Sequence, residues 1–139
     1  MVNAMSNSVV PKFSIVVGNS YGAGNYAMCG RAYDPRLMLA WPTARLAVMG
    51  GAQAAKVLLQ IQVSSRKAKG EEVSDREEKE LLEKITARYD AQTSPDYAAA
   101  RLWVDEIVDP RSTRAWISAG IEAAQFAPTE EWKMGVLQT

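Results

Sequence analysis

The sequence predicts an α/β fold in a single small domain. Three short runs of apolar and β-branched residues are typical of buried strands, and two longer segments have the apolar spacing of amphipathic helices. The chain has 139 residues, of which 47% are hydrophobic, so it can bury one core but not comfortably two. We expect the strands at 13–17, 37–41 and 46–49, and the helices at 52–62 and 74–89.

The stretch 13–28 contains the first strand, a glycine-rich turn and the start of a helix. The run 13–17 lies between a proline and a glycine and fits a strand buried on both faces. The turn occupies 18–24, and a helical pattern starts at Gly22 and ends before Asp34-Pro35. A helix start presents several unpaired backbone N–H groups in one place. Such a place suits an anion, or a carbonyl oxygen that becomes negative during a reaction.

The glycine spacing Gly18-x3-Gly22-x-Gly24 is neither the dinucleotide fingerprint nor a P-loop, because the order differs and no Lys-Ser/Thr follows. The glycines could serve only a tight chain reversal. However, Ala23 and Gly24 are small enough for a ligand to approach their N–H groups, and the helix dipole points to the same place. We therefore identify these two N–H groups as candidate oxyanion donors. One well-placed donor of this kind contributes about 3–4 kcal/mol in known cases.

The second half of the chain predicts mainly helices. The region 66–90 holds seven basic and eight acidic residues, which is typical of a solvated face, and we expect 66–72 to be a mobile loop. Ser74 and Glu77 have the spacing of a capping box. The apolar stripe of the helix that follows consists of Leu81, Leu82, Ile85 and Tyr89.

Further elements are expected after the charged region. Pro95 can start a short helix that reaches about 102, and 106–108 is a short strand. Asp109 and Pro110 suit the cap and first residue of the last helix, 111–126, which Pro128 ends. We expect the apolar tail to dock on a neighbouring surface or subunit.

Composition excludes several classes of function. The formal net charge is zero, which argues against nucleic acid or an anionic membrane as the main partner, and no run is long enough for a membrane span. The single cysteine, Cys29, fits a small core residue of an intracellular protein. The sequence has no histidine, which excludes Ser-His and Cys-His nucleophiles within the chain. We expect no metal site, since the commonest zinc ligand is missing.

Three long motifs lie at 10–33, at 40–51, and at 100–103 followed by 107–110 and 113–114. In this order they resemble the carboxyltransferase β subunit of biotin-dependent acyl-CoA carboxylases. The pair Asn25-Tyr26 stands where the propionyl-CoA branch carries Tyr-Asp, so the resemblance favours the methylcrotonyl-CoA branch. The last five residues, 135–139, look like the C-terminus of such a subunit.

This resemblance implies a crotonase-like ββα superhelix. Residues 1–139 would form a single domain, the last part of the C-terminal domain, with the N-terminal domain absent. The N–H groups of Ala23 and Gly24 would bind the ureido oxygen of biotin, which a separate carrier domain delivers. In the family, the biotin enolate left by carbon dioxide release takes the proton of the acyl-CoA, so no protein base is needed. We expect the cofactor site to be lined by Tyr21, Gly22, Asn25 and Tyr26. Tyr26 either shapes the acyl pocket or only packs.

The resemblance also implies partners. A biotin carboxylase and biotin carrier subunit would work with this chain in the bacterial cytoplasm or the mitochondrial matrix. We expect a homo-oligomer formed through 75–90 and 111–126. The family can carry a helical hairpin at 63–75, which we expect to be short here. Two alternatives stay open: the α subunit of a glutaconyl-CoA-type decarboxylase, and an inactive truncated assembly module. In every case the isolated chain should have little activity.

Overall fold

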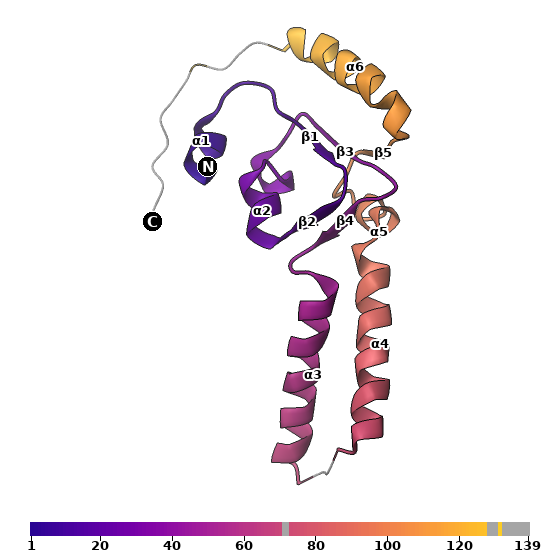
Figure 1. Ribbon diagram of the computed structural model, residues 1–139. Helices are drawn as coiled ribbons and strands as arrows, with labels where there is room; N and C mark the ends of the chain where they lie inside the picture. The colour runs from indigo at the N-terminus through magenta and orange to yellow at the C-terminus, as the bar shows by residue number, and fades with distance from the viewer. Residues whose placement is uncertain (71–72, 128–130, 132–139) are drawn as a thin grey trace.

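Two small parallel sheets and a long helical hairpin form most of the structure, a computed structural model that describes residues 1–70, 73–127 and 131 (Figure 1). One sheet has three strands in the order β1-β3-β5, and the other pairs β2 with β4. The strands are β1 (Phe13–Val16), β2 (Asn19–Tyr21), β3 (Leu37–Ala40), β4 (Arg45–Ala47) and β5 (Glu106–Ile107). The mixed α/β class that the sequence predicts is therefore observed.

The strands and helices form two successive ββα units. The first unit is β1, β2 and α2 (Gly22–Ala27), and the second is β3, β4 and α3 (Gly51–Ala68). The strands of the second unit pair in parallel with those of the first, with Phe13 opposite Leu37 and Asn19 opposite Arg45. The second unit thus repeats the course of the first and lies beside it.

The strand β3 is the buried centre of its sheet. Met38, Leu39 and Ala40 are at most 2% exposed, and β3 lies between β1 and β5. The expectation that the first strand is buried on both faces is wrong. Only Val16 of β1 is buried, and β1 is the edge strand of its sheet within the described residues.

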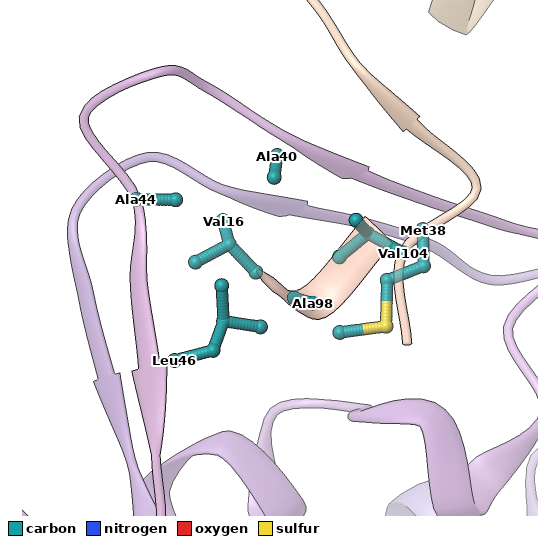
Figure 2. Close-up of a cluster of buried hydrophobic side chains, with 7 residues drawn as sticks. All are labelled: Val16, Met38, Ala40, Ala44, Leu46, Ala98 and Val104. Atoms are coloured by element: carbon teal, nitrogen blue, oxygen red, sulfur yellow. The ribbon is translucent and has the colours of Figure 1, made fainter. Parts of the chain in front are cut away.

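The core lies between the two sheets and the short helix α5 (Pro95–Ala99). Figure 2 shows its side chains converging from β1, β3, β4 and α5. The expected core position of Cys29 is confirmed, since this residue is 4% exposed. Small residues dominate the core, so the elements approach each other closely. The cluster consists of Val16, Met38, Ala40, Ala44, Leu46, Ala98 and Val104.

The helices α3 and α4 (Asp75–Thr93) pack side by side and project away from the sheets (Figure 1). Two expectations are wrong here. The first helix does not end at 62, and 66–68 is helical rather than a loop. The hairpin is not short either, because its helices have 18 and 19 residues. The glycine that ends α3 is Gly70, whose φ of +80° follows the helix with a left-handed turn.

The start of α4 confirms the predicted capping box. The N–H of Ser74 donates to Glu77 Oε2 over 2.9 Å, and the N–H of Glu77 donates back to Ser74 Oγ. The apolar stripe of α4 is partly buried against its surroundings. The opposite face of α4 is charged. Packing of the apolar stripe, and not the helix propensity of the sequence alone, therefore holds α4 in place.

Four short helical elements remain in the described part of the chain. They are α1 (Val2–Asn7), the 3-10 turns η1 (Arg31–Tyr33) and η2 (Pro110–Ser112), and α6 (Thr113–Gln125). The predicted start at Pro95 is confirmed, but α5 ends at Ala99, and Leu102 has a φ of +59°. Asp109 acts as a cap, but of the 3-10 turn η2 and not of the last helix, which starts at Thr113. The predicted end at Pro128 and the apolar tail lie outside the described residues.

The helix α6 lies at the end of the molecule opposite the hairpin (Figure 1). Gly120 rests on the first sheet, where an added Cβ would come within 2.9 Å of the Phe13 ring. The indole N–H of Trp41 donates to Thr113 Oγ1 over 2.9 Å. None of the residues of α6 is buried. Its attachment therefore depends on a few contacts.

Candidate oxyanion site

The predicted donors lie at the start of α2, directly after β2. Ala23 and Gly24 are the second and third residues of α2, where helix N–H groups have no partner within the helix. Tyr21 precedes the helix and makes no side-chain cap bond. Ala23 and Gly24 are both exposed, and no atom lies within 4 Å of the position that a Cβ of Gly24 would take. A ligand can therefore approach this pair of N–H groups.

Gly22 fixes the point where α2 leaves the sheet. Its φ is +51°, a region that favours glycine. An added Cβ would lie 2.6 Å from the carbonyl oxygen of Val48, just after β4. The helix start is thus in close contact with the second ββα unit, and only glycine fits there.

The end of α2 comes earlier than expected. The helical pattern was expected to continue toward Asp34-Pro35, but α2 ends at Ala27 and Cys29 has a φ of +68°. Ser14 Oγ donates to the carbonyl oxygen of Cys29 over 2.6 Å, which ties this reversal to β1. The strand β2 inside the predicted turn was also missed, since it has three residues and pairs with a strand remote in sequence.

The side chain of Asn25 points to β2. Its Nδ2 donates to Ser20 Oγ over 2.7 Å. A Cβ at the buried Gly30 would overlap Asn25 Oδ1 and would lie 2.9 Å from the Asn25 carbonyl oxygen. The amide of Asn25 therefore fills the space between β2 and the chain that returns after α2.

Two of the predicted lining residues are tyrosines with different surroundings. The Tyr21 hydroxyl donates to Asn19 Oδ1 over 3.2 Å, and its ring lies near Gly50. Tyr26 is 49% exposed and meets the Tyr33 ring edge-on at 4.9 Å between centroids. Loss of solvent around Tyr33, and next the neighbouring Tyr26, raises the pKa of the Tyr33 hydroxyl above its ordinary value of 10.0.

A cavity of about 480 Å³ lies between α2, β4 and the end of α4. This volume is in the range of small-molecule pockets. Gly22, Asn25 and Tyr26 contribute to its wall, whereas Tyr21, Ala23 and Gly24 do not. The structure thus brings the six predicted residues together but divides them between the cavity and the open face of α2.

Sequence reasoning missed the far wall of this cavity. Tyr89, Tyr97 and Trp103 line it from α4, α5 and the following turn, and Arg31 lines it from η1. The guanidinium of Arg31 is paired with Asp105 at 2.9 Å. Tyr89, Tyr97 and Trp103 are remote in sequence from α2, so no local pattern could place them at the site, whereas Arg31 follows α2 closely.

The described part of the chain contains no group of three or more His, Cys, Asp or Glu side chains placed to hold a metal ion. Within those same residues, no helix is long and apolar enough to cross a membrane.

Comparison with known proteins extends these observations. The fold is similar to that of the geranyl-CoA carboxylase beta subunit of P. aeruginosa, with a TM-score of 0.76 and 40% identity, over 98% of this chain and 26% of that one. The architecture is therefore that of a carboxyltransferase. The chain belongs to the carboxyl transferase domain family, whose model matches residues 1–134.

Curated relatives agree with this family. The chain is 46% identical to the probable mitochondrial methylcrotonoyl-CoA carboxylase beta chain of Drosophila melanogaster, over 99% of this chain and 24% of the relative. It is 44% identical to the biotin-dependent 3-methylcrotonyl-coenzyme A carboxylase beta1 subunit of Mycobacterium tuberculosis, over 99% and 26%. The chain thus spans about a quarter of the length of these relatives.

Proposed function

We propose that this chain supplies the biotin side of the active site of an acyl-CoA carboxyltransferase. The observation that carries the proposal is the exposed pair of N–H groups of Ala23 and Gly24 at the start of α2, with open space at Gly24. Two adjacent donors suit a neutral oxygen that gains charge during the reaction. A helix of six residues provides a weak dipole, which fits a partial charge better than a phosphate.

The ureido oxygen of biotin fits this donor pair. It is a neutral carbonyl oxygen, it can accept two hydrogen bonds, and glycine at the second donor leaves room for a ring. Bound carboxybiotin would supply the carboxyl group that is transferred. In this arrangement Ala23 and Gly24 stabilise negative charge on the oxygen, while Gly22 keeps the helix start against β4. We expect the ureido oxygen about 3 Å from both nitrogens.

The other predicted residues line the cofactor site in this proposal. Gly22, Asn25 and Tyr26 already face the cavity beside α2, and Tyr21 immediately precedes the donors. The exposed position of Tyr26 fits either a wall of the acyl pocket or packing against a further part of the enzyme. Substitution of Tyr26 that changes the preferred acyl group without changing stability would favour the first role.

The fold of the whole enzyme is proposed to be a crotonase-like ββα superhelix, with residues 1–139 as the last part of its C-terminal domain. The two ββα units with parallel strand pairing support this architecture. The substrate would be a methylcrotonyl-CoA-like thioester, in line with the names of the relatives from Drosophila melanogaster and Mycobacterium tuberculosis. Those names favour a carboxylase over the decarboxylase alternative.

The partners follow from the same proposal. A biotin carboxylase and biotin carrier subunit would deliver the cofactor, and further copies of the subunit would complete the enzyme. The location would be the bacterial cytoplasm or the mitochondrial matrix, and the name of the Drosophila melanogaster relative describes that protein as mitochondrial. This chain alone is expected to transfer no carboxyl group, because it provides one side of the site.

A substitution at Gly24 tests the donor pair. In a complete β subunit that carries these residues, Gly24→Val should lower carboxyl transfer about 100-fold or more, because the branched side chain blocks the approach to the N–H groups. Binding of acyl-CoA, measured by calorimetry, should stay nearly unchanged. Gly18→Val is the matched control, since its Cβ also meets nothing within 4 Å. Full transfer by the Gly24 variant would place the oxyanion site elsewhere and leave the assembly module as the better proposal.

A further inference from the structure

The short helix α2 cannot hold its own direction. It has six residues, and Gly24, Asn25 and Tyr26 are all weaker helix formers than alanine. Helices of this length are unstable in water by themselves. The direction of its N–H groups must come from contacts with the surrounding chain. Gly22 fixes the first residue, and the bond from Ser14 to the Cys29 carbonyl fixes the chain after the last one.

The middle of α2 is held by Asn25. Its amide nitrogen donates to Ser20 of β2 over 2.7 Å, and its oxygen atoms lie directly against Gly30. Any side chain at Gly30 would displace the amide. The amide is thus held from two sides, by a strand before the helix and by the chain after it. The contacts of its nitrogen point to β2 and not to the open face of Ala23 and Gly24.

We propose that Asn25 is a positioning residue that acts through Ser20 and Gly30 to aim the N–H groups of Ala23 and Gly24. This inference rests on the proposed function and gives Asn25 a role different from direct contact with biotin. A tilt of α2 would move both donors away from the oxygen at once. Because oxyanion donors act on the transition state, the loss should appear in kcat and not in substrate binding.

The test is steady-state kinetics of a complete carboxylase that carries these residues, with free biotin as the acceptor of the carboxyl group from a carboxylated acyl-CoA. Asn25→Ala should lower kcat about tenfold or more, while the KM values for biotin and acyl-CoA change less than about twofold. Ser20→Ala should have the same effect with Asn25 still in place. The double variant should be no slower than either single variant, because the two substitutions remove the same hydrogen bond.

A conservative variant separates positioning from general damage. Asn25→Asp keeps an oxygen that can accept from the Ser20 hydroxyl, so its kcat should lie between those of the alanine variant and the wild type. Asn3→Ala is the matched control. Asn3 Oδ1 accepts from Asn7 Nδ2 over 2.6 Å in α1, so the control removes a comparable side-chain bond outside the site. Circular dichroism should show every variant folded.

The outcomes separate this inference from the proposed function. An unchanged kcat in Asn25→Ala and Ser20→Ala, with Gly24→Val inactive, overturns the positioning role and leaves the donor pair in place. A raised KM for biotin at constant kcat shows direct contact and also overturns it. Full activity of Gly24→Val overturns the donor pair itself, and the positioning role with it.

Discussion

Gly22 carries two constraints that together exclude every other residue type. A positive φ costs a residue with a side chain about 1–2 kcal/mol, and the carbonyl of Val48 occupies the place of the Cβ. Gly22→Ala should therefore lower the free energy of unfolding by more than about 2 kcal/mol. Urea unfolding followed by circular dichroism measures this. Gly24→Ala, with no atom near its Cβ, should change stability little. Equal losses in both variants would contradict the role of the Val48 contact.

The Tyr89 hydroxyl joins the hairpin to the chain just before α3. It donates to the Met49 carbonyl oxygen over 2.8 Å and accepts from the Met49 N–H at 3.4 Å. Tyr89→Phe keeps the ring and removes both bonds, so it should cost about 1 kcal/mol of stability. Tyr21→Phe is the control, since it removes a single hydroxyl bond, to the neighbouring Asn19 side chain, and that bond joins no elements remote in sequence. A loss no larger for Tyr89 than for Tyr21 would show that the Met49 contact adds no stability.

At the scale of elements, the capping box of α4 predicts that the stability of the fold depends on pH. The backbone N–H of Ser74, and next its hydroxyl, hold the pKa of Glu77 below the ordinary value of 4.5. A carboxyl whose folded pKa is lowered stabilises the fold above its unfolded pKa, and this stability disappears as the pH falls through the folded pKa. Glu77→Gln should thus be less stable than the wild type at pH 7, and the difference should vanish well below pH 4.5.

Thermal unfolding at several pH values measures that difference. Glu78→Gln is the matched control, because Glu78 is exposed and lies outside the capping box. It should show no comparable change between pH 7 and acid. A constant difference for Glu77→Gln across this range would show that its charge does not contribute to the cap.

Local patterns predicted those elements that local contacts stabilise. The capping box and the start at Pro95 depend on neighbours in sequence, and both are observed. The strand β2 has three residues and forms only because β4 lies beside it, so its own sequence carried no sufficient signal. The charged residues around Arg66 hide the end of α3 because their pattern is also typical of a loop, whereas Gly70 marks the true end.

Within the candidate site, too, only the residues that follow a local pattern could be predicted from the sequence. The position of Ala23 and Gly24 at a helix start followed from the glycine pattern and the preceding strand. The cavity wall formed by Tyr97 and Trp103 depends on the path of the whole chain. The bond from Asn25 to Ser20 could not be predicted either, because it requires the reversal at β2 that the pattern did not show.

For the whole molecule, exposed apolar side chains predict self-association. None of the residues of α6 is buried, and Trp116 and Ile121 are 37% and 47% exposed. We expect light scattering to show an oligomer, and Ile121→Glu to shift it toward smaller species without loss of helix content. Ala123→Glu, at another exposed position of α6, should have a smaller effect. A clean monomer of the unsubstituted chain would contradict this prediction.

The hairpin of α3 and α4 separates two parts of the molecule that can change independently. The end of α3 at Ala68 and the start of α4 at Asp75 form the tip of the hairpin, and both lie far from the strands and from α2 (Figure 1). A loop can be lengthened at small entropic cost when its ends are already held together. A fluorescent protein or an affinity tag inserted at this tip would therefore report on assembly of the enzyme in cells while leaving the donor helix unaltered.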